Sequence, residues 1–471
     1  MLRFLILHIL LVSLTLLYAS TNAFSVMGGK SSSYSLCTHS KPLCTRLYSK
    51  SKPPRDLVLY RDNNGWCPFC ERTWTLLEQT KTPYTEKLIN LRSKPQYYLK
   101  LVPTTLVPAI QFDVSVRKDK DIIKELESDM FSNVTKIMKR RNPIARMMGK
   151  RRVVIWESVQ TMMAIEKFLS PQHPGKIFMA DSPTKEKAEK LLSDVTKAGF
   201  TLNYPRGFGN NTSTPSTTPE ERRKNFEDAL TALDSFLALT GGPFMLGSAW
   251  TASDINIIPT LERLRYQLPI SQDFVLYDAG RWPAIAGWFD AMDGLEGYYG
   301  RTSGDEISWL STIPVFARMF QGPDGISKES EEKAVRAEER IKELMEELKS
   351  TDLSTLDEAY RYEAASKILN NREAIVSDIV NSAPKSQDHI ARVDDIRDNR
   401  EAIEEMLEVV IFKLLMSDLT GGNEEEEGRV SDIYAAIARQ GAEVMAQRVC
   451  APRDMSAPAA KALRVALLSV C

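Results

Sequence analysis

A chain of 471 residues is longer than one ordinary domain and suits two or three. Its apolar fraction of 43% provides for sizeable cores, and past the first twenty residues no apolar run is long enough to span a membrane. Seven basic and no acidic residues precede Asp56; removing these seven from the 61 basic residues leaves 54 against 62 acidic ones, a net charge of −8. This acidic body argues against nucleic acid as a partner, and we expect no membrane span in the mature form.

The first 55 residues predict a targeting presequence. An apolar run, Phe4 to Tyr18, follows Arg3 and ends in small residues, as in a secretory signal peptide. Residues 24–55 are serine-rich, basic and free of acids, which is typical of a transit peptide. The tandem resembles the bipartite plastid presequences of algae with secondary plastids. We therefore predict a signal peptide over 1–23, a transit-like segment over 24–55 and a plastid location, with secretion as the alternative.

Strand and helix patterns alternate over the next ninety residues. Helical spacing is expected at 71–79, 95–102 and from 121 onward. Strands are expected at 56–60, 84–91, 107–112 and 114–117. This order predicts an α/β thioredoxin-like domain over residues 56–145.

The remainder of the chain has mainly helical patterns. An all-helical domain is expected over residues 146–322, beginning with a long amphipathic helix at 153–169. Thr251 and Asp254 have the spacing of a capping box and open another helix. Residues 323–471 form an acidic helical extension, which we expect to pack on the core or to bind a protein partner.

The motif Cys67-Pro68-Phe69-Cys70 carries the chemistry. It follows the first strand and begins a helix, where unpaired backbone N–H groups and the helix dipole favour a thiolate, the reactive form of cysteine. Pro68 at the first helical position loses no hydrogen bond. Cys70, one turn later, has the position of a resolving thiol. We therefore predict Cys67 as the nucleophile and Cys70 as a second catalytic thiol.

The cysteine pair has two other interpretations, a zinc site and a structural pair. Zinc sites usually need two matched pairs, and beyond the presequence only Cys450 and Cys471 remain, far along the chain. No metal is therefore expected. The two cysteines could also be structural by coincidence. Four cysteines are too few for a disulfide framework.

The surrounding sequence resembles the glutathione S-transferase superfamily, in particular its cysteine-type omega and dehydroascorbate-reductase classes, over roughly residues 56–320. The resemblance implies a transferase core with an all-helical second domain. Beyond residue 320, Ala451 to Ser456 looks similar to the extension of iota-like transferases of photosynthetic organisms. Omega-type enzymes carry one active-site cysteine, so Cys70 is a glutaredoxin-like departure.

The resemblance also implies a glutathione site. The segment Asn90 to Tyr97 is similar to one whose lysine contacts the glycyl carboxylate. A cis-proline turn pairs its backbone with the cysteine of glutathione, and a Glu-Ser pair holds the γ-glutamyl group. An extended stretch after Phe112 departs from the family's spacing. The implied binding residues are Phe69, Lys94, Val107, Pro108, Glu127 and Ser128.

The function that the resemblance implies is a glutathione-dependent thiol transferase or reductase. Cys67 would attack a glutathione mixed disulfide or an oxidised small molecule such as dehydroascorbate, with glutathione as co-substrate. The alternatives are a binding or scaffold protein that acts through its extension, and a glutathione-ligated iron–sulfur carrier. A homodimer is compatible with the sequence.

Overall fold

The computed structural model describes residues 53–170, 177–178, 182–204, 217–319, 325–382, 400–417, 430 and 434–470. The predicted signal peptide and all but the last three residues of the transit-like segment lie outside the described residues, as does Cys471. The chain divides into two compact units. One comprises Ser49–Glu347 with Cys450–Ala460, and the other comprises Leu348–Val449 with Lys461–Cys471.

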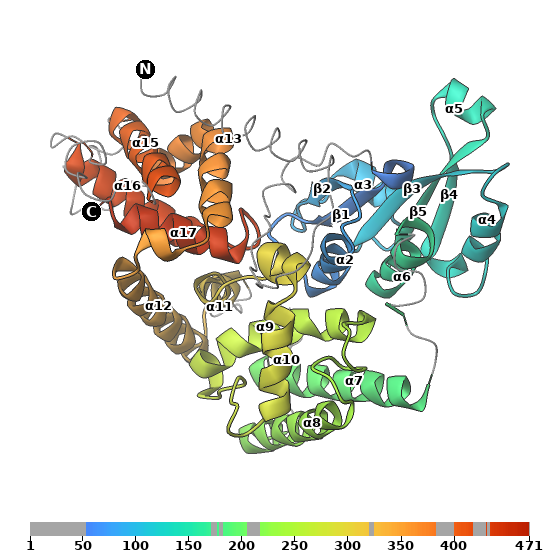
Figure 1. The fold of residues 1–471 in the computed structure, drawn as a ribbon, viewed down its shortest axis with the longest axis horizontal. Coiled ribbons are helices and arrows are strands. Elements are labelled where there is room, and N and C mark those ends of the chain that lie inside the picture. The colour runs from blue at the N-terminus through green and yellow to red at the C-terminus, as the bar shows by residue number, and fades with distance from the viewer. Residues whose placement is uncertain are drawn as a thin grey trace, which may run out of the picture. The chain divides into compact units, whose positions relative to one another are not determined.

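A five-stranded sheet with the order β2-β1-β3-β5-β4 forms the α/β part of the first unit (Figure 1). Its first two strands are parallel and the other pairs are antiparallel. The strands are β1 Val58–Asp62, β2 Thr85–Ile89, β3 Ala109–Ser115, β4 Thr135–Lys139 and β5 Lys150–Trp156. The helical elements are η3 Pro54–Asp56, α2 Pro68–Gln79, α3 Gln96–Leu101, α4 Lys120–Leu126, η4 Ser132–Val134, α5 Pro143–Met147, α6 Ser158–Ala164 and η5 Ile165–Leu169. The predicted thioredoxin-like α/β fold is thereby confirmed.

Two predicted elements differ from the structure. The expected strands at 107–112 and 114–117 are one strand, β3. The expected helix at 153–169 begins as strand β5, because Val153, Val154 and Ile155 are β-branched and fully buried in the middle of the sheet. The predicted domain boundary at residue 145 therefore falls inside the sheet region, which continues through η5.

The segment between β3 and β5 is longer than the extended stretch that the sequence predicts after Phe112. It contains α4, η4, β4 and α5, and β4 becomes the edge strand of the sheet. The strands β4 and β5 form an antiparallel hairpin with α5 at its tip.

An all-helical region completes the first unit, as predicted. Its core includes the large buried side chains of Phe226, Trp282, Trp288 and Phe289. The predicted capping box is present, since the Thr251 backbone N–H donates to Asp254 Oδ2 at 2.8 Å. The helical elements are α7 Pro183–Asn203, α8 Pro219–Leu239, α9 Ala252–Gln272, α10 Pro283–Asp293, η6 Tyr298–Thr302, α11 Glu306–Met319 and α12 Lys328–Lys349.

The second unit is a helical cluster, as expected for the extension. Its elements are η7 Leu353–Thr355, α13 Glu358–Ser382, α15 Arg400–Met416, α16 Ala435–Arg448 and most of α17 Ala457–Leu468. The guanidinium of Arg464 is fully buried there and donates to the carbonyl oxygens of Ala446 and Val449 at 3.3 and 2.7 Å. Among the described helices, none combines the length and apolar character that crossing a membrane requires.

Candidate active site

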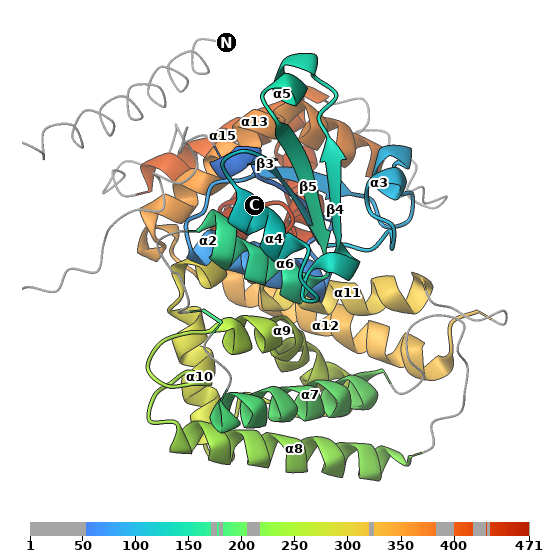
Figure 2. The ribbon, with the colours of Figure 1, turned by 90° about the vertical axis from the view of Figure 1, so that its right-hand side faces the viewer.

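Three strand ends meet at one edge of the sheet. The pairing of Tyr60 with Ala109 brings the end of β1 beside the start of β3, and the pairing of Ala109 with Trp156 adds the end of β5. The peptide bond between Val107 and Pro108, just before β3, is cis, as predicted. This edge therefore collects the start of α2, the cis-proline turn and the residues that follow β5 (Figures 1 and 2).

Cys67 occupies the N-cap position of α2, and Pro68 is the first helical residue, as predicted. Asp62, at the end of β1, fixes this turn: its Oδ2 accepts the backbone N–H groups of Trp66 and Cys67 at 2.8 and 3.3 Å. The Cys67 side chain is partly exposed, whereas Cys70 is buried. The first thiol can thus meet a substrate while the second lies behind it.

The two thiols differ in acidity. A hydrogen bond from the Cys70 thiol holds the pKa of Cys67 below its ordinary value, against the opposing effects of burial and of Asp62. The backbone N–H groups of Cys70 and Phe69 act in the same direction as the Cys70 thiol. Burial, followed by the interaction with Cys67, raises the pKa of Cys70 well above its ordinary value. Cys67 is therefore the thiol that ionises first.

The same corner offers three potential metal ligands. The side-chain ligand atoms of Asp62, Cys67 and Cys70 lie within 4.8 Å of one another. Two thiolates and a carboxylate are the donor types of zinc sites. The expectation that no metal binds here remains a prediction.

Two of the other predicted glutathione residues lie near the same edge, Lys94 in a loop and Phe69 in the first turn of α2. Lys94 is half-buried in the loop between β2 and α3. Because β1 and β2 are parallel, this loop leaves the sheet beside the end of β1. The Phe69 side chain is 51% exposed. The Arg72 guanidinium lies over the Phe69 ring, 5.0 Å from the ring centre. The Tyr98 hydroxyl donates to the Leu106 carbonyl at 2.6 Å and anchors the segment ahead of the cis-proline.

Glu127 and Ser128 do not lie at this edge. They follow α4, whose Glu125 forms an ion pair with Lys167 near the far end of α6 and η5. The structure therefore does not bring the predicted Glu-Ser pair to Cys67 or to the cis-proline turn. The reason is that both residues belong to the long segment between β3 and β5, residues 116–149, which lies away from the site.

A second Glu-Ser pair lies where the first was expected. Glu157 and Ser158 directly follow β5, and the β3–β5 register, continued by one residue, places Glu157 opposite Pro108. Glu157 is exposed and has a φ of 71°, a conformation that L-residues rarely adopt and that often marks functional sites. The signal in the sequence was the β-branched run before Glu157, which marks the strand that must precede this pair.

A segment from the end of the chain reaches the active-site turn within the first unit. A Cβ on Gly65, which has a φ of 70°, would lie 3.3 Å from Pro452 Cγ. The backbone N–H of Ala451 donates to Ser308 Oγ on α11 at 2.9 Å. Nothing in the sequence indicated that residues 450–460 contribute to the surroundings of Cys67.

Behind the turn lies a buried charged group on α2 and α9. Arg263 Nη2 donates to the Trp66 carbonyl at 3.1 Å and to Glu71 Oε2 at 2.8 Å. Burial raises the pKa of Glu71, and Arg263 opposes that shift. Burial also raises the pKa of neighbouring Glu262 well above its ordinary value, with Glu71 adding to the shift. Arg263 thus links the helical region to the residue that precedes Cys67.

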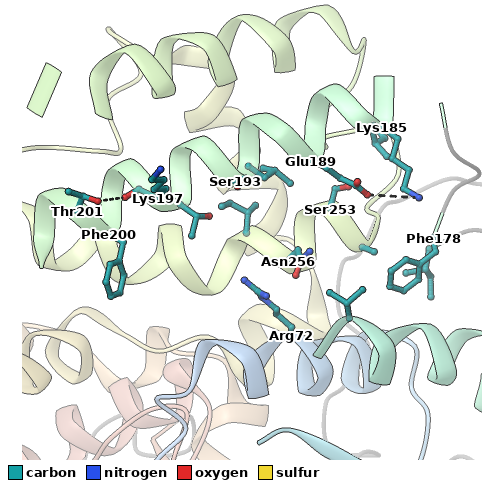
Figure 3. A pocket seen from close by; sticks show the side chains of 17 residues that line it. Arg72, Phe178, Lys185, Glu189, Ser193, Lys197, Phe200, Thr201, Ser253 and Asn256 are labelled. Carbon is teal, nitrogen blue, oxygen red and sulfur yellow. Dashed lines mark hydrogen bonds and ion pairs between the residues drawn. The ribbon is translucent and has the colours of Figure 1, made fainter. Parts of the chain in front are cut away.

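A pocket of about 500 Å³ opens between α2 and α6 on one side and α7 and α9 on the other (Figure 3). Arg72 extends from α2 toward Asn256 on α9. Arg72 Nε and Asn256 Oδ1 are buried and have no hydrogen-bond partner among the described residues. Phe178 and Phe200 add apolar walls. The pocket therefore suits a ligand with both polar and apolar parts.

Two protein families match segments of the chain. The glutathione S-transferase N-terminal domain matches residues 66–128, and the glutathione S-transferase C-terminal domain matches residues 220–291.

Similar proteins include glutathione S-transferase DHAR3, chloroplastic, of Arabidopsis thaliana, 36% identical over 61 residues, which are 13% of this chain and 24% of that protein. Pyrimidodiazepine synthase of Drosophila melanogaster is 24% identical over 240 residues, 51% of this chain and 78% of that protein. The match to the Arabidopsis protein thus spans about a quarter of its length.

Among solved structures, glutathione transferase Omega 3C from Trametes versicolor has 20% identity and a TM-score of 0.40, covering 60% of this chain and 98% of that chain. The two family matches lie in the sheet region and in the helical region described above. Residues 66–128 and 220–291 of the chain therefore match the N- and C-terminal domains of glutathione S-transferases.

Proposed function

We propose that the protein is a glutathione-dependent thiol transferase with Cys67 as its nucleophile. The Cys67 thiolate attacks the glutathione sulfur of a mixed disulfide; the S–S bond breaks, and the substrate sulfur leaves with the bonding electrons and takes up a proton. Cys67 is then glutathionylated. A second glutathione, as thiolate, attacks that disulfide and leaves as oxidised glutathione, which regenerates the Cys67 thiolate.

The observation that carries this proposal is the position of Cys67. Its partly exposed thiol caps α2, receives a hydrogen bond from Cys70 and lies at the sheet edge that holds the cis Val107–Pro108 turn. A cysteine forms a disulfide with glutathione, which favours reduction over conjugation. Dehydroascorbate is a second substrate of the same chemistry, since two glutathione molecules supply the two electrons that its reduction needs. The resemblance to dehydroascorbate reductases supports it.

Mass spectrometry after treatment with oxidised glutathione tests the proposal directly. We expect one glutathione on Cys67, or a bond from Cys67 to Cys70 formed after that adduct. If Cys67 stays free of both while oxidised glutathione is in excess, the proposal fails. A visible absorbance band after anaerobic purification would instead indicate the iron–sulfur alternative.

Cys70 can lower the pKa of Cys67 through its hydrogen bond, and it can form a disulfide with Cys67. A pair of variants separates these two roles. In Cys70→Ala the hydrogen bond to the Cys67 sulfur is lost, so the pKa of Cys67 should rise. In Cys70→Ser a hydroxyl donor remains, so the pKa should rise less, although neither variant can form the internal disulfide. The pH dependence of Cys67 alkylation by iodoacetamide measures the shift. Equal alkylation profiles for the two variants would contradict the role of the hydrogen bond.

We also propose Glu157 and Ser158, in place of Glu127 and Ser128, as the residues that hold the γ-glutamyl group. A carboxylate suits the amine of that group, and a hydroxyl suits its carboxylate. The two glutamates form a matched pair of variants. Glu157→Gln should raise the KM for glutathione about tenfold or more, because a charge-assisted hydrogen bond is lost, while Glu127→Gln should leave it unchanged. The reverse order would restore the first assignment.

The pocket beside Arg72 is our candidate site for the substrate that reacts with glutathione, because it opens on helix α2, which Cys67 caps.

The chloroplastic names of two relatives support the predicted plastid location. A chain truncated near residue 322 would lose the extension and, with it, Pro452 from the active-site turn, so loss of activity in that chain would not support the scaffold alternative.

A further inference from the structure

The β4–β5 hairpin is a projection whose surface chemistry the glutathione site does not use. The paired strands extend to Lys139 and Arg151, and the residues between them form the tip that carries α5. In both views the tip points away from the rest of the sheet and from the helices of its own unit (Figures 1 and 2). Asn142 orders the tip, because its side chain accepts the backbone N–H groups of Ile144 and Ala145.

The hairpin is strongly basic. Residues 135–152 contain no acidic side chain and eight basic ones, although the body of the chain has a net charge of −8. The basic residues are Lys136, Lys139, Arg140, Arg141, Arg146, Lys150, Arg151 and Arg152. Arg140 pairs with Asp113 at 3.4 Å. Lys139, Arg141 and Arg146 make no ion pair with any residue that the structure describes. The charge is therefore concentrated at the tip.

The tip also exposes large apolar side chains. Ile144, Met147 and Met148 are 65%, 79% and 58% exposed. Their spacing of three and four residues places them on one face of the α5 turn, where they would normally be buried against a core. On the chain these three residues lie between Arg141 and Lys150, with Arg146 among them, so basic side chains flank the face.

Protection of a sheet edge does not account for this pattern. Lysines on an edge strand discourage pairing with another chain, and Lys136 and Lys139 on β4 fit that role. The exposed apolar residues and the three tip arginines, Arg140, Arg141 and Arg146, lie beyond the last paired residue of β4. Nucleic acid would match the charge but offers little to a cluster of isoleucine and methionine.

We propose that the tip of this hairpin, residues 139–150, binds the surface of an anionic lipid bilayer. Ile144, Met147 and Met148 enter the boundary between headgroups and acyl chains, and the flanking basic side chains contact lipid phosphates. The mature protein would then be attached to a membrane without crossing it. This proposal does not depend on the proposed thiol transfer.

Sedimentation of the full chain with large unilamellar vesicles tests the proposal. Vesicles of phosphatidylcholine with about one third phosphatidylglycerol should bind the protein more tightly than pure phosphatidylcholine, and salt should weaken the difference. Arg141→Glu with Arg146→Glu should lower the affinity on the order of 30-fold, since each basic side chain near an anionic surface contributes roughly fivefold. Ile144→Ser with Met147→Ser and Met148→Ser should lower it about tenfold or more.

Matched controls lie elsewhere in the first unit. Lys224→Glu with Lys328→Glu makes the same charge change at exposed sites, and Leu239→Ser with Val275→Ser removes side chains that are 80% and 58% exposed. Both should bind vesicles like the wild type. All variants carry the same N-terminal apolar segment, so its contribution cancels.

Three outcomes overturn the proposal. The tip variants and the controls could lose binding equally. The wild type could show no preference for anionic vesicles. A nucleic-acid duplex or a second copy of the chain, seen by gel shift or by light scattering, could instead bind in a way that the tip variants abolish while vesicle binding is unchanged.

Discussion

Cys67→Ser should reduce the rate of deglutathionylation by roughly a thousandfold or more, because a serine hydroxyl at neutral pH does not supply the thiolate that attacks a disulfide. A peptide carrying a glutathione mixed disulfide is the substrate, and release of the free peptide thiol is measured. Cys450→Ser is the matched control, since Cys450 is the other described cysteine of the first unit outside the motif. Its rate should stay close to that of the wild type. Full activity in Cys67→Ser would remove the basis of the proposed function.

The pH dependence of the wild-type rate gives a second test of the role of Cys67. The hydrogen bond from Cys70 lowers the pKa of Cys67, so the thiolate persists below the pH at which an ordinary cysteine is protonated. The rate should therefore hold as pH falls below the ordinary value and decline only as pH passes through the lowered pKa. Because Cys70 ionises well above Cys67, only Cys67 of the two motif cysteines should react with iodoacetamide over the intervening range.

The sequence was sufficient for the parts of the site that depend on local order. A strand, a turn, Cys-Pro-x-Cys and a helix follow one another within about twenty residues, so the position of Cys67 at a helix N-terminus needed no tertiary information. The cis-proline turn directly before β3 was predictable in the same way.

The proposed Glu-Ser pair was not predictable from local order because the chain contains three such pairs, Glu127-Ser128, Glu157-Ser158 and Glu329-Ser330. Choosing between Glu127 and Glu157 requires knowing which strand pairs with β3, and that depends on recognising residues 116–149 as an addition to the sheet. The β-branched residues of β5 also fit a helical pattern on their apolar faces, so periodicity alone misassigned them. Contact between Gly65 and Pro452 joins residues almost 400 positions apart and has no local signal.

Arg263→Met should destabilise the first unit by about 3–5 kcal/mol, because it leaves the carboxylate of Glu71 buried without its partner. Glu71 is 1% exposed, and Arg263 stacks 4.2 Å from the centre of the Trp309 ring. Urea unfolding, followed by tryptophan fluorescence, measures the loss. Arg265→Met on the same helix is the control, since Arg265 forms a part-exposed ion pair with Asp293 and should cost about 1 kcal/mol or less.

The response to pH distinguishes a lost charge pair from a simple packing defect. The pKa of Glu71 is already raised by burial, and Arg263 holds that rise in check. Without Arg263 the pKa should rise further, so the folded state of the variant carries a penalty that grows above the unfolded-state pKa and disappears as protonation neutralises Glu71 at low pH. The difference in stability between Arg263→Met and the wild type should therefore shrink as pH falls. Glu71→Gln combined with Arg263→Met should recover most of the loss at neutral pH. A deficit that is independent of pH and unchanged in the double variant would show that the arginine acts through packing on Trp309 rather than through its charge.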